Sequence, residues 1–199
     1  MIHRKQIDAF LTKWERRELV GYVPCNPRNF TGLNGDAGDI FKPIGASGVT
    51  IATGLDLGQQ SERELVKYGL PASLVTKFKP YIGLKKADAV EALATLPLCI
   101  SDAECDEVNA CVHSAYIARA QNLYERQSVA KFDDLPCEAQ VVVVSLVYSL
   151  GSPKKFFPKA WGGLCTQDWY TAGNELCDAN GFASARRHDE GVMLLAIED

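Results

Sequence analysis

The apolar segment 141–150 constrains the fold more than any other part of the sequence. Its four successive valines suit a β-strand, but Pro136 stands where a first helical turn begins and Gly151 where a helix commonly ends. The whole stretch 134–151 is also longer than most strands, so we expect a buried helix. Because a bilayer span needs about 20 apolar residues and this run is about half as long, we expect a core segment rather than a transmembrane helix.

The chain after residue 60 is expected to be helical almost throughout. S-E-R-E at Ser61 and S-D-A-E at Ser101 are capping boxes, in which a serine and a glutamate satisfy the free N–H groups of a first turn. The helix that begins at Ser101 is long enough to connect two lobes. The other predicted helices cover residues 71–80, 85–96, 134–151, 167–178 and 184–197. An N-terminal helix is predicted from the apolar stripe of Ile7, Phe10, Leu11 and Trp14.

Composition places the chain among soluble globular proteins. Its 199 residues are 47% hydrophobic and 23% charged, which is enough to bury a core as one domain or as two closely packed lobes. The net charge of -4, with Lys and Arg dispersed, provides no basic surface for nucleic acid. Neither nucleic acid nor a membrane is therefore expected as a partner.

The cysteines and the N-terminus leave the compartment open. The seven cysteines favour an oxidising destination, but their number is odd and no C-x-x-C pair suits zinc, so disulfides and buried free thiols both remain open. Cys105 and Cys111 lie about 240° apart around their helix and cannot bond each other there. The N-terminus carries Asp8 where an apolar region would lie, so we expect no Sec-type signal peptide. Action in the cytoplasm, export by another route and excision from a larger protein all remain open.

Glu15 is a candidate general acid. It follows Trp14 at the edge of the apolar helical stripe, where a carboxylate can be partly desolvated, as a general acid needs. An ordinary solvated carboxylate is the simpler interpretation, and Glu18 would serve as well. The periodicity does not choose between them.

The segment S-G-V-T-I-A-T-G-L-D-L-G-Q, residues 47–59, holds the other candidates. It follows a stretch, 21–48, that is rich in Gly, Pro, Asn and Asp and is predicted to form a long loop or short irregular strands. Alternation around Thr50 predicts a short strand, and the glycines predict turns near Asp56. With Glu15, this segment would supply the two carboxylates needed to cleave a glycosidic bond. Threonine is equally a common strand residue, and aspartate a common turn residue.

Several segments together resemble the lysozyme domain of pesticin-like bacterial toxins, which are relatives of phage-type lysozymes. The resemblance runs from about residue 7 to 195 and is carried by Glu15, 21–24, 47–58, 140–151, 168–176 and 186–191. It implies an α+β, mostly α-helical, lysozyme-like fold, with a small N-terminal β-containing lobe and a larger helical lobe joined by a long helix. One such domain would cover 1–199, with the active site in a loop and strand lobe at 20–60 and helices in 1–19 and 61–199.

The resemblance implies a muramidase, which hydrolyses the β-1,4 bond between N-acetylmuramic acid and N-acetylglucosamine in peptidoglycan. Glu15 matches the catalytic acid of the family, Thr50 its strand threonine and Asp56 its second carboxylate. Tyr22 and Gln59 are the candidates for substrate binding. No metal or organic cofactor is expected.

The second carboxylate departs from the phage pattern. Phage lysozymes carry their aspartate before the strand threonine, whereas Asp56 follows Thr50 here, so Asp36 and Asp39 stay open as alternatives. Phage lysozymes invert the anomeric carbon, and inversion is therefore expected. It would place the two carboxyl groups about 6.5–9.5 Å apart.

The remaining polar and aromatic candidates are interpreted as structural. Arg186 and Arg187 could contact substrate carboxylates, but internal pairing with Asp189, Glu190 or a distant acid is favoured. Three scattered histidines do not suggest a metal site: His3, His113 and His188. Packing is expected for the tryptophans Trp14, Trp161 and Trp169.

The resemblance further implies bacterial antagonism or lysis, with action in the periplasm or on the cell wall of a target bacterium. The expected partner is the peptidoglycan glycan strand, the protein is expected to be a monomer, and an immunity protein or a secretion-machine carrier is left open. Two rival functions remain. One is a non-catalytic glycan-binding or phage structural module on the same fold, and the other is a lytic transglycosylase.

Overall fold

The computed structural model describes residues 1–25, 45–181 and 183–198. The chain forms two compact units. Unit 1 combines Met1–Trp14 with His113–Asp199, and unit 2 is Glu15–Val112. The described residues are mostly helical and carry one small antiparallel sheet, which confirms the predicted α+β class.

The helices and strands are divided between the two units. Two helices have residues in both units: α1 (Arg4–Glu15) and α5 (Asp102–Glu125). Unit 1 adds α6 (Cys137–Leu150), α7 (Pro153–Phe156), α8 (Pro158–Thr166), α9 (Trp169–Cys177) and α10 (Ser184–Leu195). Unit 2 contains β1 (Glu18–Tyr22), β2 (Thr50–Ala52), β3 (Leu55–Asp56), α2 (Glu62–Lys67), α3 (Ala72–Phe78) and α4 (Lys86–Thr95).

Helix α6 lies in the core of unit 1, so the prediction of a buried helix for the valine run is confirmed. Every residue from Ala139 to Val147 is buried. Gly151 ends the helix with a φ of 67°, a left-handed conformation that glycine adopts without steric cost, and its N–H donates to the carbonyl of Val147. Pro136 is the residue just before the first helical residue, where its missing N–H costs nothing.

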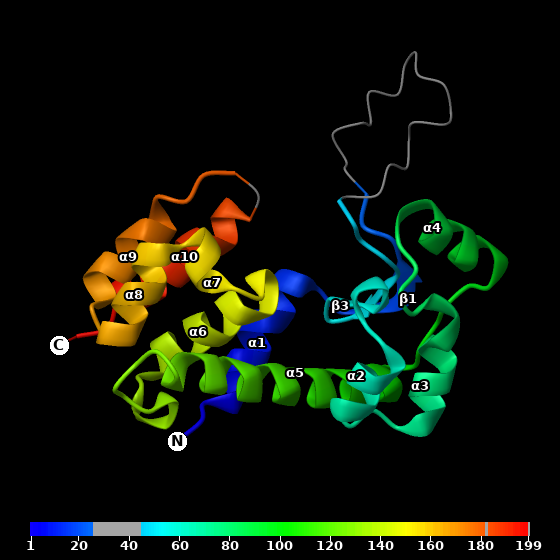
Figure 1. Ribbon diagram of the computed structural model, residues 1–199, viewed down its shortest axis with the longest axis horizontal. Helices are drawn as coiled ribbons and strands as arrows, with labels where there is room; N and C mark the ends of the chain where they lie inside the picture. The colour runs from blue at the N-terminus through cyan, green and yellow to red at the C-terminus, as the bar shows by residue number, and fades with distance from the viewer. Residues whose placement is uncertain (26–44, 182, 199) are drawn as a thin grey trace, which may run out of the picture. The chain divides into compact units, whose positions relative to one another are not determined.

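Helices α8, α9 and α10 pack side by side in unit 1 (Figure 1). Trp161 of α8 and Trp169 of α9 are buried in the same apolar cluster as α6, which confirms that these two tryptophans pack in the core. Helices α7 and α8 were not predicted from the sequence. Both helices are short and have proline in their first turn.

Unit 2 is built around the sheet, whose order is β1-β2-β3 with both pairs antiparallel. Strand β1 was not predicted, because its pairing depends on residues far along the chain. The N–H of Gly21 donates to the carbonyl of Leu98 at 2.8 Å, and the N–H of Ile100 donates to the carbonyl of Leu19 at 2.9 Å. A five-residue strand that contains glycine gives no local signal of such a partner.

The local predictions for helix starts hold in unit 2. Ser61 and Glu64 form a complete capping box at the start of α2. Ser101 and Glu104 exchange the same pair of hydrogen bonds at the start of α5, at 2.8 and 3.2 Å. All seven cysteines are free, which excludes disulfides in this structure. In the described part of the chain, every helix is too short or too polar to cross a bilayer.

Candidate functional site

The sheet of unit 2 places three of the residues singled out from the sequence in one row. Tyr22 on β1 pairs with Thr50 on β2, and Thr50 pairs with Asp56 on β3. Directly paired residues of an antiparallel sheet point to the same face, with Cβ atoms about 5 Å apart. The side chains of Tyr22, Thr50 and Asp56 therefore start from neighbouring positions on one face of the sheet.

Glu15 reaches the same part of unit 2 from the end of α1. It is the last residue of that helix, and it is followed by Arg16 with a φ of 60°. The half-buried Glu15 side chain lies against the turn between β2 and β3, because a Cβ atom added to Gly54 would fall 2.9 Å from Glu15 Oε2 and 3.2 Å from Glu15 Cβ. Only glycine leaves room for the carboxylate there, and the φ of 78° at Gly54 also suits glycine.

The phenol of Tyr22 lies within electrostatic reach of both candidate carboxylates. Burial raises the pKa of Tyr22, and the negative charges of Glu18, Glu15 and Asp56 raise it further. A phenol that stays protonated between acidic groups is a hydrogen-bond donor. Tyr22 is 38% exposed, so a ligand above the sheet can contact its ring.

Asp56 is held by the backbone on both sides of the hairpin. Its Oδ1 accepts the N–H of Gly48 at 3.1 Å and the N–H of Gly58 at 2.9 Å. Burial raises the pKa of Asp56, and these two N–H donors, the side chain of Gln59 and the charge of Lys85 oppose that rise. A carboxylate with a raised pKa is a stronger base.

The glycines at positions 48 and 58 make this arrangement possible. A Cβ atom at Gly48 would lie 2.5 Å from the Cα of Gly58 and 2.4 Å from the carbonyl oxygen of Leu84. The two backbones therefore touch, which brings both N–H groups to one oxygen of Asp56. This close contact explains why the segment 47–59 has glycine at positions 48 and 58.

Thr50 and Gln59 complete the residues predicted from the sequence. Thr50 is buried, and its Oγ1 lies 3.5 Å from the carbonyl oxygen of Gly48, the residue that donates to Asp56. Gln59 is exposed and donates from Nε2 to the carbonyl of Ala46 at 2.7 Å. This hydrogen bond joins Gln59 to the loop next to Asp56, and its role in substrate binding stays a prediction.

Asn109 on α5 is a part of the site that the sequence reasoning missed. Its Oδ1 accepts the N–H of Thr53 at 3.1 Å, at the tip of the β2–β3 turn. The neighbouring Ala52 has a φ of 55°, a conformation that costs a non-glycine residue about 1–2 kcal/mol. Asn109 therefore holds a strained turn against which the side chain of Glu15 rests. No local pattern in the sequence links these residues.

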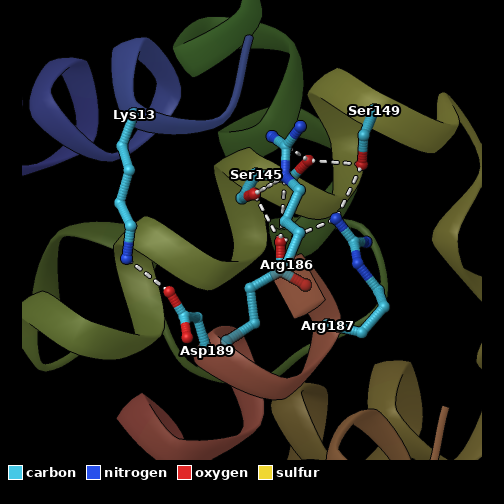
Figure 2. A network of polar contacts seen from close by, with 7 residues as sticks. Lys13, Ser145, Ser149, Arg186, Arg187 and Asp189 are labelled. Carbon is cyan, nitrogen blue, oxygen red and sulfur yellow. Dashed lines mark hydrogen bonds and ion pairs between the residues drawn. The ribbon is translucent and has the colours of Figure 1, made fainter. Parts of the chain in front are cut away.

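Arg186 and Arg187 are part of a buried ionic network in unit 1, so their predicted internal pairing is confirmed (Figure 2). Arg187 Nη2 lies 2.8 Å from Glu190 Oε1, and Arg186 Nε lies 3.5 Å from the same oxygen. Ser145 of α6 donates to that oxygen at 2.5 Å, and Arg187 also donates to Ser149 at 3.1 Å. Both guanidinium groups are buried, and Asp189 pairs with Lys13 instead.

The candidate His113 belongs to unit 1. His113 is buried, and its Nδ1 lies 2.8 Å from Asp8 Oδ1. Among residues 1–25, 45–181 and 183–198, no three His, Cys, Asp or Glu side chains gather as metal ligands would. The alternative carboxylates Asp36 and Asp39 lie outside the described residues.

Comparison with known families identifies the family to which this chain belongs. Residues 6–170 match the family model of Pesticin, described as a bacterial toxin homologue of phage lysozyme, C-terminal part. The chain therefore belongs to this family of lysozyme homologues, and its resemblance to pesticin-like toxins is confirmed. A comparison with curated proteins gave no match.

Proposed function

We propose that this protein is a muramidase, which hydrolyses the β-1,4 bond between N-acetylmuramic acid and N-acetylglucosamine in peptidoglycan. The observation that carries the proposal is that two carboxylates lie at one small sheet. Glu15 contacts the β2–β3 turn at Gly54, and Asp56 on β3 pairs with Thr50 on β2. Membership in a family of lysozyme homologues supports the substrate class. Two carboxyl groups in different surroundings suit glycoside hydrolysis, which needs an acid and a base.

Glu15 is assigned the general acid, which donates its proton to the leaving glycosidic oxygen. Its position supports this role, because the side chain is half-buried and its carboxyl group is held against the turn at Gly54. Glu18, the other acid considered, lies within β1 and pairs with Ala52. A fixed carboxyl group can meet the leaving oxygen in one orientation, which is what proton transfer requires.

Asp56 is assigned the second carboxylate, which stabilises the positive charge that develops on the sugar and activates a water molecule. Thr50, its cross-strand partner, is assigned to hold that water. Tyr22 supplies a ring beside the bond to be cleaved. The product is expected to be inverted, as in phage lysozymes, which corresponds to carboxyl groups about 6.5–9.5 Å apart.

A role in bacterial antagonism goes with this activity. The matching family consists of bacterial toxins, so the protein is proposed to act on the cell wall of a target bacterium, in its periplasm, with the glycan strand as its partner. It is proposed to act as a monomer and without a cofactor. An immunity protein that blocks the Glu15 and Asp56 face of unit 2 would protect the producing cell.

The first test compares clearing of purified peptidoglycan by wild type, Glu15→Gln and the matched control Glu18→Gln. Removing a general acid costs about 100-fold to 10,000-fold in rate, so Glu15→Gln should lose clearing while Glu18→Gln keeps most of it. Circular dichroism confirms that the variants are folded. Full activity of folded Glu15→Gln would remove Glu15 from the mechanism. If wild type bound peptidoglycan without clearing it, and Glu15→Gln and Asp56→Asn bound it equally well, the rival of a non-catalytic glycan-binding module would be favoured.

A lytic transglycosylase is the second candidate, and one observation favours it. Oδ1 of Asp56 is bound by two backbone N–H groups, as in a purely structural aspartate, and a transglycosylase needs an acid but no water-activating base. Mass analysis of the released fragments separates the two reactions, because a transglycosylase leaves anhydro ends. Asp56→Asn keeps an acceptor for both N–H groups, so its activity reports the role of the charge.

A further inference from the structure

Unit 1 carries a hollow that is not part of the site in unit 2. It has a volume of about 670 Å³ and is lined by residues of α7, α8 and α9 and by the residues that follow α9. Volumes of this size are typical of sites for small organic ligands. The hollow is open and mixed in chemistry, with aromatic rings, hydroxyl, amide and charged groups around it.

The floor of the hollow is one face of α9. Tyr170, Asn174 and Asp178 follow one another at intervals of four residues, so they form a ridge along the helix. The opposite face of α9, which includes Trp169 and Leu176, is buried in the core. This ridge is therefore fixed in place by the packing of the helix that carries it.

Two exposed aromatic rings stand at the hollow. Tyr170 is 74% exposed and Phe156 is 53% exposed, although large aromatic side chains usually bury most of their surface. Lys155 lies over the ring of Phe156 at 5.8 Å, and the carbonyl of Tyr170 accepts the side-chain amide of Asn174 at 2.7 Å. The ring of Phe156 thus has a cation over it, the hydrogen bond of Asn174 is made to the backbone of Tyr170, and both rings line the same polar hollow.

The wall opposite the ridge is joined to α9 by a partly buried hydrogen bond. Oε2 of Glu175 accepts the N–H of Ala160 at 2.5 Å, in the first turn of α8. This bond joins α9 to the start of α8 and holds Lys159, the cation that lines the hollow, on the rim. The shape of the hollow therefore does not depend on a ligand.

The chemistry of the lining selects among ligands. A phosphate ligand would meet the carboxylates of Glu175 and Asp178, which offset the charges of the cations found there among the described residues, Lys159 in the lining and Lys155 over the ring of Phe156. An apolar ligand would bury Asn174 and Asp178 without hydrogen-bond partners, which is costly. A sugar suits both the aromatic rings and the polar side chains of the hollow. Its apolar face stacks on an aromatic ring, while its hydroxyl and acetamido groups form hydrogen bonds with amide and carboxylate side chains.

We propose that this hollow is a second carbohydrate site, which binds neutral N-acetylated amino sugars of the peptidoglycan glycan strand through Phe156, Tyr170, Asn174 and Asp178. The choice of this glycan rests on the proposed function, whereas the sugar-binding chemistry of the hollow does not. The site would hold the protein on its polymeric substrate between cleavage events, and it would contribute less to the cleavage of short fragments.

The test uses the whole chain as Glu15→Gln, titrated with tetra-N-acetylchitotetraose and followed by the amide NMR signals of α9. The sugar should shift the signals of Tyr170 and Asn174 in a saturable way. Because an aromatic contact contributes about 0.5–1.5 kcal/mol, Tyr170→Ala and Phe156→Ala should each weaken this binding about twofold to tenfold. Tyr170→Phe, which keeps the ring, and Val192→Ala, which changes an exposed residue of α10 that does not line the hollow, should leave it unchanged.

The outcomes separate this inference from the proposed function. Absence of shifts in 156–179 at saturating sugar, or unchanged binding by Tyr170→Ala and Phe156→Ala, overturns the second site even if wild type clears peptidoglycan. Clearing by folded Glu15→Gln overturns the catalytic assignment even if the hollow binds sugar. In the active protein, the Tyr170→Ala variant should clear intact peptidoglycan more slowly and cleave short soluble fragments at the wild-type rate.

Discussion

Replacing Gly54 by alanine should disable the site without unfolding the protein. The added Cβ would lie 2.9 Å from Glu15 Oε2 and 3.2 Å from Glu15 Cβ, whereas nonbonded atoms rest at about 3.5 Å or more. Rotation of the glutamate side chain can move its oxygen but not its Cβ, whose position is set by the backbone of Glu15. The carboxyl group therefore has to shift by about half an ångström, which is the limit of productive geometry.

The expected losses follow from these contacts. Misplacement of a catalytic group by about 1 Å can cost 100-fold, so Gly54→Ala should lower kcat about tenfold to 100-fold. The φ of 78° adds about 1–2 kcal/mol of strain for alanine, which is a fall in Tm of about 2–8 °C for a chain of this length. The assay is peptidoglycan clearing, with Tm measured on the same samples.

Gly69→Ala is the matched control for the backbone. Gly69 has a φ of 87° and nothing within 4 Å of its added Cβ, so alanine there brings the same strain without the contact to Glu15. The control should show a similar fall in Tm and keep its activity. Wild-type kcat in folded Gly54→Ala, or an equal loss in Gly69→Ala, would refute the reasoning.

Three further predictions address the support of the site and of the core. Asn109→Ala should leave the N–H of Thr53 without its acceptor, lower the free energy of unfolding by about 1–3 kcal/mol and reduce clearing. Asn109→Asp keeps the acceptor and should therefore have the stability of wild type in denaturant unfolding. Asp56→Ala should be less stable than Asp56→Asn by about 1–3 kcal/mol, because asparagine can still accept the two glycine N–H groups; equal stability of the two variants would contradict this. Burial raises the pKa of Glu190 from 4.5 to about 7, although the neighbouring Arg187 and Arg186 oppose the rise, so protonation of Glu190 stabilises the folded state at low pH and this contribution is lost as the pH rises from about 4.5 to about 7. Unfolding of wild type between these pH values should show the loss, and Glu190→Gln should show a flatter profile; an equally steep profile in the variant would contradict the assignment.

The elements that were predicted correctly are those whose signals are local. The helix α6 follows from a continuous apolar run between a proline and Gly151, and the starts of α2 and α5 follow from serine and glutamate pairs three residues apart. Each of these signals depends on neighbours within one or two turns of the chain. Strand β1 and its pairing with the residues around Leu98 depend on a distant partner, and no local pattern could supply it.

The candidate site was predictable in part for the same reason. The spacing of Thr50 and Asp56 predicts a strand and a turn, and the register makes them direct neighbours. The contact of Glu15 with Gly54 and the support from Asn109 depend on tertiary packing. Periodicity placed Glu15 only at the margin of a helix face, and its choice over Glu18 came from the family resemblance.

The most direct test of the central claim identifies the new reducing end in digested peptidoglycan. Purified peptidoglycan is digested to completion, reduced with borohydride, hydrolysed and analysed for reduced amino sugars. A muramidase that uses Glu15 and Asp56 yields muramitol with wild type and with Glu18→Gln, and a rate of release at least about 100-fold lower with Glu15→Gln. Glucosaminitol as the product, anhydro ends in place of a reducible end, or undiminished muramitol release by folded Glu15→Gln would contradict the account.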